Sequence, residues 1–431
     1  MTPDTKRQPR FHSDGGKPRR VGYRGDVASR PLETPPFNSP PAIEPGYRRA
    51  LTRAQRPRAP VLLALACLAC TNTDDSEPRD TGPAGDALRV PAEWEPQAAI
   101  WLQWPQRWEA SYEPAFARIV ATILRHEAVH ILVNDASTRR SAEEALEVEG
   151  GLSAAVIGGA ASSQGFRITW HDIPNDNAWM RDNGPTWVVQ DGEVRIQDWG
   201  FDAWGGAFGA GIPYEADDAV PVAVGAALDV PVDGVDIVHE RGNLEFNGSD
   251  GVILNWSTIG DAGRNPGITR EDVERAMRRH FGVSRVVIVE GAPEGDLTGG
   301  HIDGIARFID EERVVVADCS KSSRCEPGGH DDQIYDDAAE QIAAQGFEVV
   351  RWPFLGAVAY RDTTFDTDYM NWLVGNGFVA TVGFDNPATD SAAKAQIEAW
   401  FPGREVYIIE TLESWYAGGG VHCHTNDQPA G

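Results

Sequence analysis

Short runs of apolar, mostly β-branched residues recur along this chain, and between them lie stretches whose apolar residues have helical spacing. The runs predict strands, and the intervening stretches predict amphipathic helices. Strands that alternate with helices define an α/β protein. The predicted strands are 194–196, 251–254, 285–289, 313–316, 347–350, 378–382 and 406–409, and the predicted helices are 113–127, 269–280, 332–345 and 390–400.

These elements predict a single domain over residues 89–429, within which the composition shows no break. The helix that begins near Thr269 has Asp272 three residues further on, which resembles a capping box. Pro402-Gly403 ends the last predicted helix. No Gly-rich phosphate loop connects a strand to a helix, so a nucleotide-binding fold has no support.

The first 88 residues differ in composition from the predicted domain. Residues 1–50 are rich in Pro, Arg and Gly with little apolar periodicity, and we expect them to be an over-extended start or a disordered tail outside the mature protein. In residues 51–70, arginines precede an apolar run that is too short to span a bilayer as a helix and has the shape of a signal-peptide core. Residues 71–88 are predicted to be a polar tether.

Two cysteines, Cys67 and Cys70, lie at the end of the apolar run, and a polar stretch follows them. A cysteine in this setting resembles the lipid-attachment site of bacterial lipoproteins. Cys70 is favoured, although neither cysteine has the usual Leu three residues before it. The leader therefore predicts an exported protein, periplasmic or held at the cell surface by a lipid on Cys70. If the leader is only an apolar patch in a disordered tail, the protein is cytoplasmic.

Without the leader the chain is strongly acidic. Residues 1–70 hold 13 of the 38 Lys and Arg and 5 of the 65 Asp and Glu, so 25 basic and 60 acidic side chains remain, a net charge of −35. Such a surface repels nucleic acid and anionic lipid and attracts cationic ligands. We therefore expect no nucleic-acid partner.

Cys423 lies in the segment Gly418-Gly419-Gly420-Val421-His422-Cys423-His424. Glycines allow positive φ and close approach of neighbouring groups, so we expect this thiol at a tight turn after a strand. A cation near a thiol favours the nucleophilic thiolate, and the two flanking histidines could supply one. The alternative is a buried structural cysteine, because free cysteines are among the most buried residues.

Two further cysteines, Cys319 and Cys325, flank a short polar loop. In an exported protein this pair is expected to close a disulfide, whereas in the cytosol the two would be ordinary thiols. No second Cys/His pair has the spacing of zinc ligands, so we expect no metal site.

Three separate segments place acidic residues and a histidine next to turn signals. Asp182 precedes Asn-Gly-Pro and is expected at a strand or loop edge, and Glu240 ends a short apolar run. His301 and Asp303 are two residues apart between glycines, so on an extended segment they would point to the same face. Each carboxylate alone is more often a helix cap or a solvated turn residue.

Together these residues suit one reaction. A guanidinium is planar and always charged, and carboxylates match it with paired hydrogen bonds. Several carboxylates could hold it while a thiolate attacks its central carbon, and a histidine could protonate the leaving nitrogen and then activate water. The products are a ureido group and ammonia, and the reaction needs no metal or organic cofactor.

Segments spread over nearly all of residues 89–429 resemble the agmatine deiminase and bacterial peptidylarginine deiminase family. The resemblance implies a five-bladed, pseudo-symmetric α/β propeller of the pentein type. The segments that carry it are 90–96, 100–105, Asn177-Ala178-Trp179-Met180-Arg181-Asp182-Asn183-Gly184-Pro185-Thr186, 198–206, Glu240-Arg241-Gly242-Asn243-Leu244-Glu245-Phe246, 264–266, Gly300-His301-Ile302-Asp303, 401–404 and 418–423.

The resemblance also implies a role for each candidate residue. It makes Cys423 the nucleophile and His301 the acid and base. It makes Asp182 and Asp303 ligands of the guanidinium, with Glu240 a further acidic residue of the pocket. Trp179 either lines the pocket beside the alkyl stem of the substrate or is a core tryptophan.

The chain departs from the agmatine branch of this family at two places. Arg241 stands where that branch usually has glycine, and His424-Thr425-Asn426-Asp427 replaces a common Ile-Thr-Gln-Gln. Arg241 could repel the distal amine of agmatine or bind a carboxylate of another guanidine, and otherwise it points to solvent.

Three functions remain open at this point. The default is deimination of agmatine to N-carbamoylputrescine through a covalent thiouronium on Cys423. Export favours the first alternative, a peptidylarginine deiminase that forms citrulline in proteins. The second alternative is an inactive, cation-binding lipoprotein, although Cys423, His301 and the aspartates are all present. The sequence leaves the oligomeric state open.

Overall fold

The structure of the protein, a computed structural model, describes residues 88–209 and 212–431. The predicted signal peptide, both of its cysteines and almost all of the predicted tether lie outside these residues. In the part of the chain that is described, no helix is both long enough and apolar enough to cross a membrane.

Four three-stranded sheets repeat one pattern along the chain. In each of them the first strand is antiparallel to the second, and the second is parallel to the third. The sheets are β4 (Thr186–Gln190), β5 (Glu193–Gly200) and β6 (Val232–Val238); β7 (Glu245–Phe246), β8 (Gly251–Asn255) and β9 (Arg285–Val289); β10 (Ala306–Phe308), β11 (Arg313–Asp318) and β12 (Glu348–Pro353); and β15 (Leu373–Gly375), β16 (Phe378–Gly383) and β17 (Glu405–Glu410).

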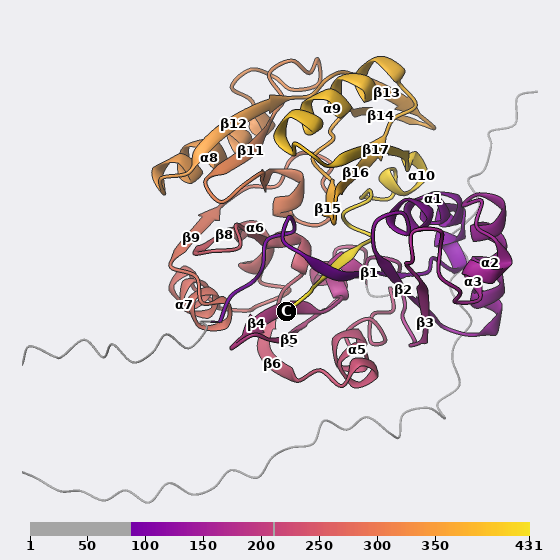
Figure 1. The fold of residues 1–431 in the computed structure, drawn as a ribbon. Coiled ribbons are helices and arrows are strands. Elements are labelled where there is room, and N and C mark those ends of the chain that lie inside the picture. Colours follow the sequence, from indigo (N-terminus) through magenta and orange to yellow (C-terminus); the bar gives the residue numbers. More distant parts are fainter. Residues whose placement is uncertain (1–87, 210–211) are drawn as a thin grey trace, which may run out of the picture. The chain divides into compact units, whose positions relative to one another are not determined.

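A fifth sheet combines the two ends of the described domain. Strand β18 (Asn426–Pro429) is antiparallel to β1 (Gln97–Gln103), and β1 is parallel to β2 (Ala128–Val133), which in turn is parallel to β3 (Ile168–Asp172). The fifth sheet thus repeats the same pattern with one additional strand. Figure 1 shows the sheets around a common centre with the longer helices outside. The α/β class and the five-bladed propeller are therefore confirmed.

Four of the longer helices lie where the sequence predicts them, with shifted ends: α1 (Glu113–Ile123), α7 (Arg270–Phe281), α8 (His330–Ala344) and α9 (Pro387–Trp400). Two more, α2 (Ala136–Val148) and α5 (Val220–Leu228), were not predicted. The capping box of α7 is present, because Thr269 Oγ1 accepts from the Asp272 amide at 3.2 Å and Asp272 Oδ2 accepts from the Thr269 amide at 3.1 Å. Helix α1 is four residues shorter than predicted, since the chain turns after Ile123.

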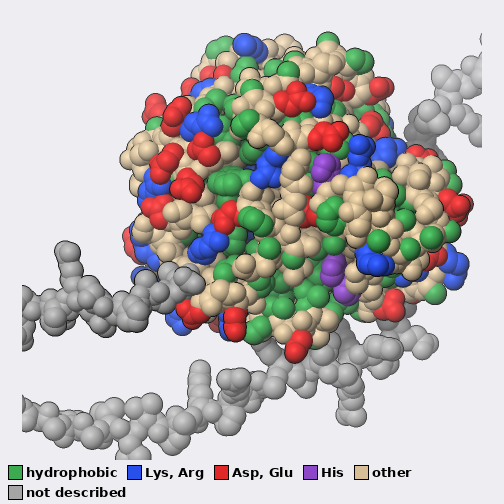
Figure 2. Space-filling model, in the orientation of Figure 1, with side chains coloured by type: hydrophobic (Ala, Val, Ile, Leu, Met, Phe, Trp, Pro, Cys, Tyr) green, Lys and Arg blue, Asp and Glu red, His purple; other side chains and the backbone are tan. Residues whose placement is uncertain are grey.

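All seven predicted strands fall on β5, β8, β9, β11, β12, β16 and β17. The core consists of the apolar side chains of the sheets and of the helices packed on them, and it includes the fully buried Trp101, Trp104 and Trp372. Acidic and basic side chains are interspersed on the face that Figure 2 displays.

Two small features of the fold lie near the site described below. One is the antiparallel hairpin of β13 (Ala357–Tyr360) and β14 (Thr363–Asp366), which is a sheet of its own. The other is a pair of one-turn helices, α4 (Met180–Asn183), which carries Asp182, and α10 (Leu412–Trp415), which precedes the Cys423 segment. Two further one-turn helices are α3 (Ala154–Ile157) and α6 (Trp256–Ile259).

Candidate active site

Cys423 lies on a tight turn, as the glycine-rich segment predicts, but this turn follows the one-turn helix α10 and not a strand, and it precedes β18. Of the three glycines only Gly418 has a positive φ, at 122°. Gly419 is needed for close approach, because a Cβ there would lie 2.7 Å from the Cys423 sulfur and from the Trp179 ring. The thiol is only 5% exposed. It nevertheless lines a cavity of about 340 Å³, together with His301, Asp303 and Asn371, so it is not a purely structural core cysteine.

Asn371, which the sequence analysis missed, fixes both the turn and the sulfur. Its Oδ1 accepts from the backbone amides of Gly420 and His422, each at 3.0 Å, and of Cys423 at 3.3 Å. Its Nδ2 lies 3.0 Å from Cys423 Sγ and 3.3 Å from Asp303 Oδ2. A single asparagine 52 residues away from the cysteine carries no local signal of such a role.

The flanking histidines do not supply a cation to the thiol, so this expectation is wrong. His422 contacts Asp303 through Nδ1 at 2.7 Å and Glu93 through Nε2 at 2.6 Å. His424 Nδ1 lies 2.8 Å from the Ala178 carbonyl oxygen, and burial lowers the pKa of His424 to about 4. Burial and the neighbouring carboxylates raise the pKa of the Cys423 thiol well above its ordinary value. The resting site therefore holds a neutral thiol.

His301 lies between two carboxylates. Its Nδ1 is 3.5 Å from Asp182 Oδ1, and its Nε2 is 3.5 Å from Glu240 Oε2. Burial alone would lower its pKa, but the charges of Asp182 and Glu240 outweigh burial and raise the pKa to about 9. His301 is therefore an imidazolium at neutral pH.

The two carboxylates beside His301 differ in their environments. Burial raises the pKa of Asp182 to about 6, and its Oδ2 accepts a hydrogen bond from Trp204 Nε1 at 2.9 Å. Burial would also raise the pKa of Glu240, but contacts with His301 and Arg264 lower it to about 2. The Nε of Arg264 donates to Glu240 Oε1 at 2.8 Å.

Gly242 explains how these groups come so close. A Cβ at this position would lie 2.5 Å from Asp182 Oδ1 and 2.7 Å from His301 Nδ1. Any side chain there would therefore separate the aspartate from the histidine. Asp182 itself lies on the one-turn helix α4 and not at a strand or loop edge, which corrects the expectation from the turn signal.

Asp303 reaches the nucleophile from a short 3₁₀ turn, Ile302–Gly304, and not from an extended segment as predicted. Its Oδ2 lies 3.7 Å from Cys423 Sγ. Burial would raise its pKa, but the hydrogen bond from His422 and the positive charges of His301 and Arg307 lower it. Asp303 is therefore an ionised carboxylate beside the thiol.

Arg241 does not line the cavity, so the idea that it contacts the far end of a substrate is wrong. It is buried rather than directed to solvent, and its guanidinium donates to the Leu244 carbonyl and lies 5.2 Å from the centre of the Phe246 ring. Trp179 lies in the core, where its ring is 4.5 Å from that of His424 and 6.5 Å from that of Trp204 between centroids. Of the two predicted roles of Trp179, pocket lining and core packing, core packing fits these contacts.

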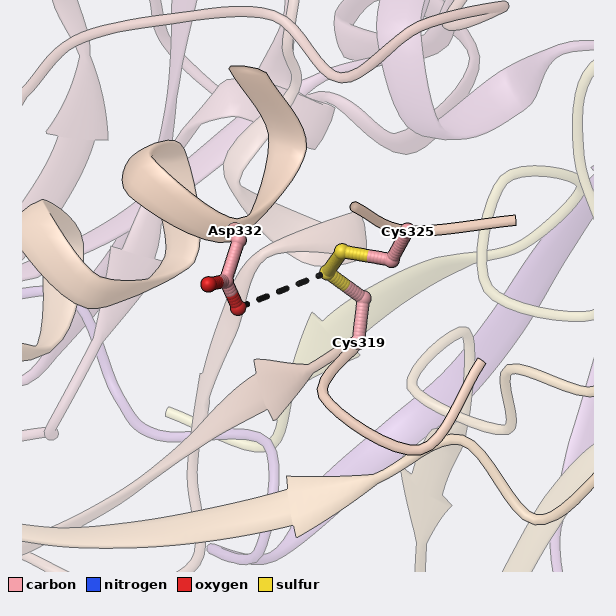
Figure 3. Close-up of side chains that lie close together, drawn as sticks. All are labelled: Cys319, Cys325 and Asp332. Carbon is pink, nitrogen blue, oxygen red and sulfur yellow. Dashed lines mark hydrogen bonds between the residues drawn. A yellow bond between two sulfur atoms is a disulfide. The ribbon is translucent and has the colours of Figure 1, made fainter. Parts of the chain in front are cut away.

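The Cys319–Cys325 disulfide is present, as Figure 3 shows. Asp332 from α8 lies beside it, with Oδ1 3.9 Å from Cys319 Sγ. Two thiolates and a carboxylate could bind a metal, but the sulfurs are bonded to each other here and offer no thiolate ligand. Both cysteines line the cavity that also holds Cys423.

Comparison with known proteins places this site in a family. The sequence profile of the Porphyromonas-type peptidyl-arginine deiminases matches residues 89–429. An agmatine deiminase of Pseudomonas putida is 31% identical over 383 residues, covering 81% of this chain and 97% of that protein. An agmatine deiminase of Pseudomonas aeruginosa is 29% identical over 391 residues, covering 82% and 99%. The solved structure of an agmatine deiminase of Enterococcus faecalis superposes with a TM-score of 0.67 at 24% identity, covering 80% and 96%.

The chain belongs to the Porphyromonas-type peptidyl-arginine deiminase family. It is accordingly an enzyme that hydrolyses the C–N bond of an amidine group.

Proposed function

We propose that the protein deiminates a small guanidine, with agmatine as the default substrate and N-carbamoylputrescine and ammonia as products. The observation that carries this proposal is that a buried thiol, an imidazolium and the ionised carboxylate of Asp303 line one cavity, while Asp182 and Glu240 lie against the imidazolium. Such a site favours a compact cation. The names of the Pseudomonas relatives support agmatine.

Binding activates the nucleophile in this proposal. Asp182 and Asp303 hold the guanidinium next to Cys423, and Glu240 keeps His301 charged. The positive charge of the substrate offsets the two aspartates that raise the pKa of the thiol. The thiol proton then leaves to solvent, and the thiolate forms only when a substrate is present.

The first half of the reaction forms a covalent intermediate. The sulfur of Cys423 attacks the central guanidinium carbon, and the resulting adduct has a carbon–sulfur bond and three nitrogens. His301 gives its proton to one terminal nitrogen, which leaves as ammonia when its bond to carbon breaks. The product on the enzyme is a thiouronium.

The second half releases the ureido product. Neutral His301 removes a proton from a water molecule, and the oxygen adds to the same carbon. The carbon–sulfur bond then breaks, so that the thiolate is restored, and the protonated urea loses its extra proton to solvent. His301 is again an imidazolium, and no other reactant is consumed.

Ammonia release from the purified protein tests this function. Agmatine, free arginine and a peptide with an internal arginine are offered in parallel, with Cys423→Ser as the blank. Turnover of agmatine supports the proposal. Turnover of the peptide alone would instead identify a peptidylarginine deiminase, and silence on all three would favour the inactive, cation-binding alternative.

The place where the enzyme works is a separate part of the proposal. The basic and apolar leader supports export, with a lipid on Cys70 as the anchor. Cys70→Ser is expected to move the protein from the membrane fraction to the soluble fraction, as measured by immunoblot of fractionated cells. An unchanged distribution would exclude lipidation at this residue.

A further inference from the structure

The cavity that reaches the nucleophile has one wall that the proposed reaction does not use. Its inner end is formed by Cys423 and by His301, which is 3% exposed and whose two ring nitrogens have no hydrogen-bond partner among the described residues. The other wall is formed by the end of hairpin β13–β14 and the residues after it, including Asp366 and Asp368. A substrate that reacts at the inner end can extend along this wall.

Acidic side chains outnumber basic ones in the lining of the cavity. Arg324 is the only Lys or Arg among the described residues that line it, and its guanidinium donates to the Thr364 carbonyl. The acidic residues of the lining are Glu294, Asp296, Asp303, Asp331, Asp366 and Asp368. A chain with a neutral or anionic far end would leave these carboxylates without compensation.

Asp368 is a carboxylate of the lining that lies close to two other carboxylates. Burial, together with the nearby charges of Asp303 and Asp366, raises its pKa to about 7. One of its oxygens, Oδ1, accepts a hydrogen bond from the Met370 amide at 2.8 Å. A cation beside Asp368 would therefore relieve repulsion among three carboxylates at once.

Asp366 is held by the loop that the disulfide closes. Ser322 lies between Cys319 and Cys325, and its hydroxyl donates to Asp366 Oδ1 at 2.6 Å. The same loop contacts the hairpin a second time, through Arg324 and the Thr364 carbonyl. The disulfide in Figure 3 thus limits the movement of a loop that positions one wall of the cavity.

We propose that Asp366 and Asp368 form a subsite for an ammonium group at the end of the substrate distant from the guanidinium, and that the disulfide-closed loop 319–325 positions Asp366 for this contact. The proposal rests on the proposed deimination of a small guanidine. It defines the substrate class as alkylguanidines with a cationic far end. Peptidyl arginine, whose stem ends in neutral amides, is disfavoured.

Two substrates that differ only at the far end test the subsite. Agmatine carries the ammonium, and butylguanidine has the same four-carbon chain without it. In Asp366→Asn and Asp368→Asn we expect the ratio of kcat/KM for agmatine to that for butylguanidine to fall about 10- to 100-fold, which is the range for one charge-assisted contact. Asp337→Asn makes the same charge change on the exposed face of α8, outside the cavity lining, and is the matched control.

An unchanged ratio in both cavity variants, or the same fall in Asp337→Asn, would overturn the subsite. A wild-type protein that turns over neither guanidine would instead contradict the proposed function, so the two failures are distinguishable. If Asp368→Asn does not fold, Asp366→Asn and Ser322→Ala still decide, because both alter the same contact.

Reduction tests the role of the disulfide-closed loop. Treatment with dithiothreitol opens Cys319–Cys325 and leaves Cys423 a thiol. We expect KM for agmatine to rise several-fold while kcat changes little, because the loop positions the wall and does not touch the reacting carbon. Identical KM values before and after reduction, with the opened disulfide verified by thiol titration, would overturn this part of the proposal.

Discussion

His422 lies next to Cys423 in sequence and contacts two buried carboxylates, Asp303 and Glu93. Replacing it gives the sharpest test of the site. Its Nδ1 lies 2.7 Å from Asp303 Oδ2, and its Nε2 lies 2.6 Å from Glu93 Oε1. Each contact is short enough to require a proton between its two atoms. Asparagine can keep only the donor to Asp303, and glutamine can keep only the donor to Glu93.

The two replacements have unequal costs. Glu93 retains two guanidinium partners, Arg181 at 3.3 Å and Arg307 at 3.1 Å. Glu93 also accepts from the Val374 amide at 3.2 Å. Losing the His422 contact in His422→Asn should therefore cost only about 1 kcal/mol of the free energy of unfolding.

The carboxylate of Asp303 has weaker remaining partners than that of Glu93. In His422→Gln it would keep only the amide contact from Asn371 at 3.3 Å and the thiol at 3.7 Å. A buried carboxylate that loses its main donor costs about 3 kcal/mol. Because this carboxylate is also the proposed guanidinium ligand, we expect kcat/KM to fall at least tenfold further in His422→Gln than in His422→Asn.

Urea unfolding followed by tryptophan fluorescence measures the stability of both variants, and ammonia release measures their activity. The glutamine variant is expected to be the less stable and the less active of the two. Equal losses, or a more active glutamine variant, would show that His422 does not act through Asp303.

Three further outcomes follow from the site. Turnover should fall as the pH rises through about 9, because His301 then loses the proton that it donates. The raised pKa of His301 also stabilises the folded protein; this stabilisation is fully present below about pH 6.5 and is lost as the pH rises to about 9. Glu240→Gln should move the fall in kcat to lower pH, and a fall at the same pH would contradict the pairing of Glu240 with His301. Asp303→Asn should reduce kcat/KM at least 100-fold with an unchanged circular dichroism spectrum, and a fully active variant would remove Asp303 from the site. Arg241→Lys should leave the preference for agmatine over arginine unaltered, since Arg241 lies outside the cavity, and a shifted preference would refute that placement.

The sequence predicts the helices and strands of this fold better than the way the sheets close into a ring. Residues 285–289 form a strand, and residues 270–281 form a capped helix, because β-branched runs and capping residues act locally. The pairing of β18 with β1 joins residues more than 300 positions apart, and no periodicity encodes it. The propeller was therefore predictable only through resemblance to a known family.

The same limit applies to the site. Cys423, His301 and Asp303 could be selected from the sequence because their residue types suit the chemistry and glycines flank them. The contacts of Asn371 and Glu93 could not, since an isolated polar residue reveals its partners only in three dimensions. Arg241 was misplaced for a related reason: adjacency to Glu240 in sequence does not fix the direction of a side chain.

Strand β18, which completes the fifth sheet, has a consequence for biosynthesis. Strand β18 begins three residues after Cys423 and pairs with β1, which is among the first elements of the domain to leave the ribosome. The other sheets can form during translation, but strand β1 of the β1–β2–β3 sheet has no antiparallel partner until β18 emerges. The thiol, the turn that presents it and the strand that anchors the turn are made together at that moment. A nascent chain therefore carries an incomplete ring without a nucleophile, and catalytic competence and ring closure are expected to arise in one late folding step.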